Sequence, residues 1–355
     1  MQFGIAIPTA ADSWRLVRRA EELGFSNAWF FDTQMLNADP FVAMTAAAMK
    51  TTRIKLGTGV LIPSNRIAPV AATAFASLNR LAPGRVVFGV STGFTGRRTM
   101  GLGAVKLADM EVYIRTIQAL WRGETVEFTV EGKSRAIRYL NPELGLINID
   151  DPIPTCIAAS GPRARALTAK LGAGWIDNVA DVERGAATLE QMRAAWREAG
   201  HAVADLDAIA WIGGAVLDEG EPADSPRAMA IAGPRASMLL HRSADTALAG
   251  YPAPLAMRPE FKDAVEAYVA HARNDFEAAY YLANHRGHLM FVRPDERPHI
   301  TAAMIKGTSF TGTEREIKDK VAGLRDAGFT QVVVSVPPGQ EPMIEDWGKI
   351  RRAFG

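Results

Sequence analysis

The sequence predicts an α/β chain folded as a (β/α)8 TIM barrel, a closed barrel of parallel strands with helices around it. One local pattern recurs: the tail of an amphipathic helix, a glycine suited to the left-handed position after the helix, and a strand a few residues later. It occurs at residues 20–32, 169–177 and 322–336. Eight candidate strands also alternate with helices along the 355 residues. A doubly wound open sheet is the alternative, but no glycine-rich phosphate turn follows the first strand.

Short β-branched and aromatic runs predict the strands, and apolar residues at helical spacing predict the helices. The expected strands are residues 3–8, 53–63, 85–90, 154–159 and 208–217, with three more around Ala28, Trp175 and Val332. The expected helices are residues 13–23, 40–50, 70–81, 106–122, 163–171 and 188–199. In the fourth of these helices the apolar spacing runs through Leu107, Met110, Ile114, Ile117 and Leu120.

Two segments fall outside this repeat, and the rest of residues 1–355 is expected to form a single barrel domain. Residues 125–148 alternate in polarity around Glu131-Gly132-Lys133, which predicts a hairpin inserted before the fifth strand. Residues 218–311 begin with the acidic stretch DEGEPADSP and then favour helices at 225–250, 259–271 and 275–285. An insertion after the seventh strand lies over the mouth of such a barrel, so we expect a helical lid that covers the substrate.

Composition excludes several classes of function. A formal charge of +1 gives no electrostatic argument for binding nucleic acid or an anionic membrane. The single cysteine, Cys156, lies in an apolar run, so no disulfide forms within the chain and a core thiol is expected. The first residues lack the features of a signal peptide, and no apolar run approaches membrane-spanning length. These observations predict a soluble, cytoplasmic protein.

Two strand ends have the character of an anion site. The strand at 85–90 stops on Ser91-Thr92-Gly93, and Arg97 and Arg98 follow before the next helix. The strand at 154–159 ends on Ala159 and is followed by Ser160-Gly161-Pro162-Arg163, where a helix begins. Free N–H groups at a helix start, small loop residues and nearby cations all favour a phosphate. Ordinary strand-to-helix connections, with a simple helix cap in the second case, are the alternatives.

Three segments in order carry a resemblance to a known family: RIKLGTGVLIP at 53–63, GVSTG at 89–93 and ASGPRARAL at 159–167. They resemble the bacterial-luciferase-like oxidoreductases and, within them, the methylenetetrahydromethanopterin-reductase-like branch. The resemblance covers nearly the whole chain except residues 218–311. It implies a (β/α)8 barrel with a reduced flavin-type cofactor in its mouth, which is FMN in the monooxygenase branches and the deazaflavin coenzyme F-420 (F420) in the reductase branch. It also implies a homodimer and a small organic substrate, with a separate reductase for the cofactor as a further candidate partner.

The resemblance assigns roles to the strand ends. It places the cofactor's phosphate tail on the loop from Ala159 to Arg163, and it brings Ser91, Thr92 and Gly93 against the same cofactor. Luciferase carries an arginine where Thr92 falls, so Arg97 and Arg98 are the candidates for the missing cation. This departure favours the reductase branch over the FMN monooxygenases.

The third strand ends on Gly57-Thr58-Gly59-Val60, where glycines let the backbone approach a large, flat ring such as an isoalloxazine. Related members have a non-proline cis peptide at this strand end, which maps near Gly59–Val60. An ordinary glycine turn is the alternative interpretation.

The second strand ends on Phe31-Asp32-Thr33-Gln34, where many relatives have an acidic residue followed by histidine. Asp32 matches the acidic position, whereas Thr33 replaces the histidine. Asp32 is therefore the candidate catalytic residue, as a proton donor or acceptor. Capping the next helix or anchoring the cofactor's pyrimidine edge are equal alternatives, and a proton source in the lid would come from Tyr281, His285 or His288.

The remaining candidates lie in the lid. His285 and His288 stand three residues apart, but the sequence shows no third ligand nearby and Gly287 disfavours a helix between them, so no metal site is predicted. Met257, Phe261 and Phe291 suggest a substrate with hydrophobic bulk.

Hydride transfer with coenzyme F-420 is favoured as the function, and an FMNH2- and O2-dependent monooxygenase is the alternative. A non-catalytic barrel without cofactor is the second alternative. The three intact loops argue against it, because an empty site has no use for them.

Overall fold

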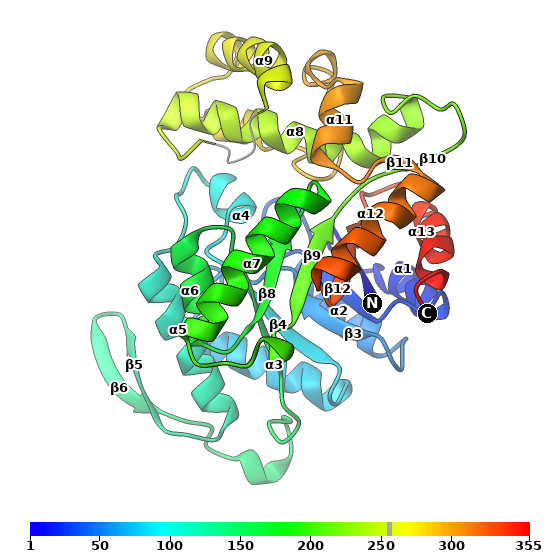
Figure 1. The fold of residues 1–355 in the computed structure, drawn as a ribbon. Helices are drawn as coiled ribbons and strands as arrows, with labels where there is room; N and C mark the ends of the chain where they lie inside the picture. The colour runs from blue at the N-terminus through cyan, green and yellow to red at the C-terminus, as the bar shows by residue number, and fades with distance from the viewer. Residues whose placement is uncertain (254–257) are drawn as a thin grey trace.

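The computed structural model describes residues 1–253 and 258–355. Within these residues eight parallel strands close into a barrel in the order β1-β12-β9-β8-β7-β4-β3-β2. The barrel strands are β1 (Gln2–Ile7), β2 (Asn27–Phe30), β3 (Lys55–Thr58), β4 (Val86–Val90), β7 (Thr155–Ala158), β8 (Gly174–Asn178), β9 (Ala208–Ile212) and β12 (Gln331–Ser335). The predicted (β/α)8 barrel is confirmed (Figure 1).

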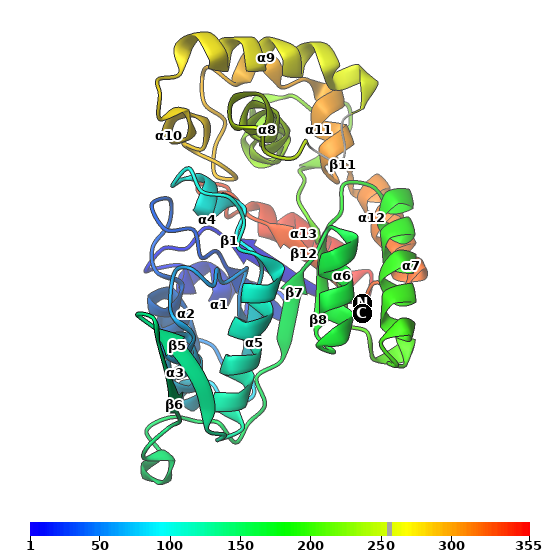
Figure 2. The ribbon, with the colours of Figure 1, turned by 90° about the vertical axis from the view of Figure 1, so that its left-hand side faces the viewer.

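Helices surround the barrel, and five of the six that had predicted bounds begin and end within two residues of them (Figures 1 and 2). They are α1 (Trp14–Glu22), α2 (Pro40–Ala48), α3 (Ala68–Leu81), α5 (Leu107–Trp121), α6 (Pro162–Lys170), α7 (Val182–Glu198), α12 (Glu314–Ala327) and α13 (Met343–Arg352). Helix α7 begins six residues before its predicted start at residue 188, because the Asp181 side chain accepts a hydrogen bond from the Arg184 N–H and caps the helix there. A short helix, α4 (Thr95–Arg98), occupies what the sequence indicated as a loop.

Two predicted strands are shorter in the structure. The third, expected at 53–63, has regular pairing only over β3, and the chain meets β4 again through an isolated bridge between Leu61 and Val90. The Gly59–Val60 peptide bond between these two contacts is cis, at the place that the resemblance predicted. The seventh strand, expected at 208–217, divides at Gly213-Gly214 into β9 and β10 (Val216–Leu217).

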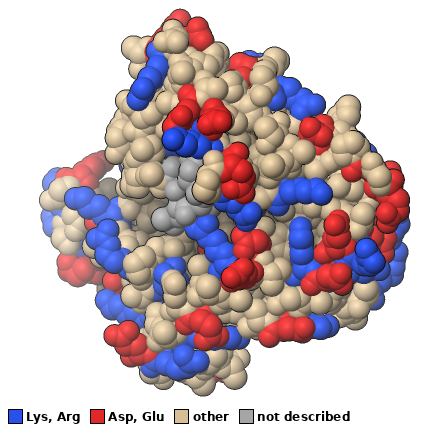
Figure 3. Space-filling view, turned by 45° about the horizontal axis from the view of Figure 1, so that its top comes forward, with Lys and Arg blue, Asp and Glu red and all other residues tan. Residues whose placement is uncertain are grey.

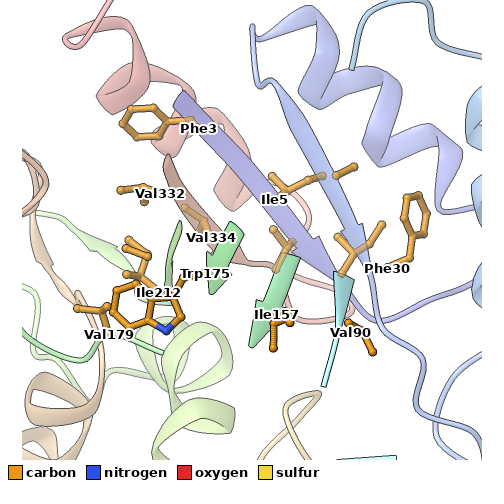
Figure 4. Packing of buried hydrophobic residues seen from close by; sticks show 14 of the residues in the cluster. Phe3, Ile5, Phe30, Val90, Ile157, Trp175, Val179, Ile212, Val332 and Val334 are labelled. Carbon is orange, nitrogen blue, oxygen red and sulfur yellow. The ribbon is translucent and has the colours of Figure 1, made fainter. Parts of the chain in front are cut away.

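Hydrophobic residues form two layers of core, one outside and one inside the strands. The outer layer packs the strands against the helices, and Figure 4 shows Ile5, Ile157 and Val332 among its members. The inner layer fills the barrel and includes Trp29 and Trp211, whose ring centroids lie 5.9 Å apart. The barrel is therefore a packed core, and a ligand can lie only above it, at the carboxyl ends of the strands.

The insertion before β7 contains a hairpin. Strands β5 (Val126–Val130) and β6 (Lys133–Ile137) pair in antiparallel fashion, and the turn residues Glu131 and Gly132 both have positive φ angles. This conformation matches a two-residue hairpin turn.

The second insertion leaves the barrel after β10 and returns at β11 (Gly312–Thr313), and these two short strands pair with each other. The expected bounds of 218 and 311 thus fall next to this pair. Between them lie α8 (Pro226–Ala249), α9 (Lys262–Asp275), α10 (Tyr280–Asn284) and α11 (Ala302–Thr308). Figures 1 and 2 show these helices above the carboxyl ends of the strands, with α4 directly beneath them. None of the helices in the described residues has the length and apolar character needed to cross a membrane.

Candidate active site

Three neighbouring strand ends form one side of the barrel mouth. Strands β3, β4 and β7 are adjacent in the barrel, so the loops that follow them lie side by side. The Ser91 hydroxyl donates a hydrogen bond of 3.0 Å to the Ala158 carbonyl, which joins the β4 loop to the end of β7. The structure therefore brings together the three groups of residues that the sequence singled out at 58–60, 91–93 and 159–163.

Two side-chain hydrogen bonds hold the loop after β7 in place. The Trp175 indole N–H donates to the Ala159 carbonyl at 2.8 Å, and the Arg165 guanidinium donates to the Ser160 carbonyl at 2.6 Å. Gly161 then occupies the N-cap position of α6, and no side chain caps this helix. A Cβ built on Gly161 would meet nothing within 4 Å. The start of α6 thus has no side-chain cap and has open space beside Gly161, two features that an anion site requires.

The side chains of the two arginines of α4 have different surroundings. Arg97 packs against the β4 loop, where a Cβ on Gly93 would lie 3.1 Å from the Arg97 Cδ, and its Nε donates to the Gly103 carbonyl. Arg98 is buried and turns toward the lid, where its Nε lies 3.6 Å from Asp245 Oδ2 and its guanidinium lies over the Tyr251 ring. Of the two predicted cations, Arg97 remains beside the small loop and Arg98 does not.

Arg163 is an exposed residue in the first turn of α6. It therefore provides a positive charge in the first turn of this helix. Figure 3 shows acidic and basic side chains interspersed over the upper face of the molecule. An anion at this place would be attracted by local cations such as Arg97 and Arg163 rather than by a broad positive field.

The third strand end contributes an apolar floor. Val60 and Ala158 are partly exposed and pack on the cluster that fills the barrel. Thr58 is fully buried, and its hydroxyl donates to the Gly89 carbonyl at 2.7 Å. A Cβ on Gly59 would lie 2.5 Å from the Trp211 ring. The glycine at position 59 thus makes room for an indole inside the barrel, which is a different reason from the approach to a ligand ring that the sequence suggested.

Asp32 acts as an anchor in this structure. Its side chain is 3% exposed and accepts hydrogen bonds from the Ile62 N–H and the Asn65 amide, both at 3.1 Å. The Arg66 guanidinium donates to its other oxygen at 2.9 Å. All three donors belong to the loop that follows the cis peptide, so the carboxylate ties the end of β2 to that loop. Proton transfer by Asp32 stays a prediction.

We expect Asp32→Asn to lower the free energy of unfolding by about 2 kcal/mol, because a charge-assisted hydrogen bond to Arg66 is lost in a buried place. Urea denaturation measures this change. Asp39→Asn is the matched control, since Asp39 pairs with the same arginine at 45% side-chain exposure. We expect the control to cost no more than about 0.5 kcal/mol.

Turnover distinguishes anchoring from catalysis. Arg66→Gln removes the ion pair but leaves the Asp32 carboxyl, so the two variants should lose stability and turnover together if Asp32 only positions the loop. Turnover that is lost in Asp32→Asn and kept in Arg66→Gln would identify Asp32 as the proton-transfer group.

The lid is attached to the barrel by a residue that the sequence did not single out. Arg235 of α8 is 7% exposed and donates to the carbonyls of Val179 and Trp211, each at 3.2 Å, at the ends of β8 and β9. Burial lowers the pKa of its guanidinium to about 10. An arginine inside a helix pattern gives no local sign of such a contact, because its partners are backbone oxygens far away in the sequence.

The structure also locates the other residues that the sequence analysis singled out. Phe261 is 1% exposed and belongs to the lid's own core, whereas Phe291 is exposed, and Met257 lies outside the described residues. Cys156 is buried inside the barrel, and burial raises the pKa of its thiol, as expected for a core cysteine. The Tyr281 ring packs beside Gly101, where a Cβ would lie 2.8 Å from it.

Comparison with known proteins agrees with this geometry. Residues 2–331 match the family model described as luciferase-like monooxygenase. A 5,10-methylenetetrahydromethanopterin reductase of Methanolobus tindarius is 26% identical over 334 residues, 93% of this chain and 92% of that enzyme. An F420-dependent glucose-6-phosphate dehydrogenase of Beutenbergia cavernae is 41% identical over 139 residues, which are 37% of this chain and only 39% of that enzyme.

Solved structures share the fold. The coenzyme F420-dependent tetrahydromethanopterin reductase of Methanopyrus kandleri has a TM-score of 0.74 at 21% identity, covering 100% of this chain and 99% of that chain. Since the matched family covers most of the chain and these relatives are redox enzymes, the chain belongs to the luciferase-like monooxygenase family and is an oxidoreductase.

Proposed function

We propose that this protein transfers a hydride between coenzyme F-420 and a small organic substrate. The observation that carries the proposal is the uncapped start of α6, where Gly161 leaves open space beside an apolar floor. An apolar ring with a phosphorylated tail needs this combination of surfaces. The choice of F-420 follows the named cofactor of relatives such as the F420-dependent dehydrogenase of Beutenbergia cavernae.

The residues present fit such a cofactor. The N–H groups at the start of α6, with Arg163 and Arg97, would hold the phosphate, and Ser91 and Thr92 would contact it from the neighbouring loop. Val60 and Ala158 would lie under the ring. When bound, F-420 supplies the carbon centre that accepts or donates the hydride, and the protein orients the substrate against it.

The lid has a defined part in this proposal. Arg235 and Arg98 connect lid and barrel on two sides of the mouth, through β9 and through α4. A lid held over the mouth excludes water from a reduced cofactor and strengthens polar contacts to the substrate. A homodimer and a separate enzyme that regenerates the cofactor complete the proposal.

Titration with both cofactors tests the choice. We expect coenzyme F-420 to bind with a dissociation constant at least about tenfold lower than that of FMN, a difference of about 1.4 kcal/mol. Fluorescence quenching or calorimetry with each cofactor, oxidised and reduced, measures this ratio. Tight binding of FMNH2 without detectable F-420 binding would overturn the proposal in favour of an oxygen-dependent monooxygenase, a class that includes solved neighbours of the fold such as RslO1 of Streptomyces bottropensis, with a TM-score of 0.64.

A further inference from the structure

Three histidines come together inside the lid, and none of them is among the residues assigned to the cofactor. His241 belongs to α8, His285 follows α10, and His288 lies in the next turn. Their side chains are buried, with residue exposures of 0%, 1% and 2%. One ring nitrogen of each lies within 4.8 Å of one from each of the others. The sequence showed only two of the three, because His241 precedes His288 by 47 residues.

Carboxylates hold the outer nitrogens of two of these rings. The His241 Nε2 contacts Glu296 Oε1, and the His285 Nε2 donates to Asp245 Oδ1 at 3.1 Å. Each of these two rings therefore has its Nδ1 left for another partner. A carboxylate on the far nitrogen is the usual arrangement around histidines that bind a metal, since it fixes the tautomer and the orientation of the ring.

The inner nitrogens are poorly satisfied by protein groups. The Nδ1 atoms of His241 and His288 face each other at 2.6 Å, a contact that only one N–H can serve. Among the described residues, His285 Nδ1 and His288 Nε2 are buried without a hydrogen-bond partner. An unsatisfied buried polar atom costs about 1–3 kcal/mol, and a metal ion bound to His285 Nδ1 would remove one such cost.

Charged side chains of both signs surround the cluster. The carboxylates of Asp245 and Glu296 lie beside the rings. Arg98 and Arg293 face these carboxylates at 3.6 Å and 2.8 Å, and they fix them in place.

We propose that His241, His285 and His288 bind a divalent metal ion of the zinc class, which connects α8 to the segment after α10. Zinc binds imidazole nitrogens at about 2.0–2.1 Å, which puts two ligands about 3.3 Å apart, so the His241 and His288 rings separate by less than about 1 Å when it enters. The ion replaces the N–H···N contact between these rings, and the proton moves to His288 Nε2. Three imidazoles without a thiolate favour zinc, copper or nickel over magnesium or calcium.

The site would stabilise the lid. Its ligands come from α8 and from residues 285–288, and the Phe94 ring of the β4 loop lies 6.0 Å from the His288 ring. A metal here would join α8 to the segment after α10 within the lid. Because zinc binding and Tm are measured without F-420, the site can be tested whether or not F-420 binds.

Zinc titration of the full chain tests this proposal. Protein freed of metal with a chelator is titrated with zinc in competition with a chromogenic chelator, and its Tm is measured with and without zinc. We expect one zinc per chain and a higher Tm in its presence. His288→Gln should weaken zinc binding at least about tenfold, because loss of a ligand should cost no less than the loss of an outer-shell partner. His271→Gln is the matched control, because His271 lies in the same lid at 28% exposure and pairs with Asp275.

If His288→Gln does not fold, cobalt binding to the wild-type protein tests the proposal instead. The wild-type protein loaded with Co2+ should show the visible absorption bands of a four- or five-coordinate site with nitrogen ligands, and zinc should displace them. Failure of the wild-type protein to bind zinc, or an unchanged Tm in tenfold excess zinc, would overturn the proposal. Equal zinc binding by His288→Gln and His271→Gln would also overturn it, because the ion would then sit elsewhere.

Discussion

Replacing Gly161 with leucine should raise the dissociation constant for coenzyme F-420 about 100-fold without changing the free energy of unfolding. The backbone at Gly161 has φ −97° and ψ 158°, which any residue adopts, and a Cβ there meets nothing within 4 Å. The new side chain would therefore occupy the space in front of the α6 N-terminus. Loss of two charge-assisted hydrogen bonds to a phosphate is worth about 3 kcal/mol, which is about 100-fold in affinity.

Two controls make this result specific. Ala166→Leu introduces the same side chain at an exposed position of the same helix and should leave F-420 binding unchanged. Lys133→Ala changes the distant hairpin and should also have no effect. Fluorescence quenching gives the dissociation constants, and urea denaturation gives the stability. Equal affinities for Gly161→Leu and Ala166→Leu would place the phosphate elsewhere.

Replacing Gly89 with alanine should lower the free energy of unfolding by about 3 kcal/mol, at the upper end of what overpacking usually costs. A Cβ on Gly89 would lie 2.0 Å from the Thr58 carbonyl oxygen and 2.9 Å from the Trp29 ring. The first of these atoms belongs to the backbone of the neighbouring strand, so β3 and β4 must move apart. The same movement displaces Val60 and Ser91, and we expect F-420 binding to weaken as well.

Gly161→Ala is the matched control for this loss of stability. It makes the same chemical change at a position with open space, and it should change the free energy of unfolding by less than about 0.5 kcal/mol. Urea denaturation of both variants gives the comparison. A Gly89→Ala protein as stable as Gly161→Ala would show that the two strands do not approach as closely as the structure has them.

Much of the fold follows from local patterns in the sequence. Helical spacing of apolar residues and glycines after helix ends place most helices within two residues, because these signals act between near neighbours in the chain. The meeting of the loops at 91–93 and 159–163 was also predictable. Parallel strands of one barrel end at the same edge, so residues that follow them come together whatever the packing beneath.

Contacts between distant residues were beyond such patterns. Arg97 and Arg98 are neighbours of the same type, and only the presence of Asp245 in the lid separates their roles. The glycine at position 59 looks suited to a ligand, but the Trp211 ring fills the space beside it. Trp211 belongs to β9, which is far from Gly59 in the sequence. The sequence shows that Asp32 is an acidic residue at a strand end, but the three groups that donate hydrogen bonds to it lie on another loop.

The histidine cluster of the lid shows most clearly the difference between what local sequence patterns reveal and what packing determines. His285 and His288 were visible as a pair, but a metal site needs a third ligand, and His241 reaches them only because α8 packs against the turn after α10. Strand, helix and turn preferences depend on residues a few positions apart and can be read along the chain. Ligand sets, ion pairs and the space around a glycine depend on side chains that folding brings together from far apart, and these are determined by the packing of the whole molecule.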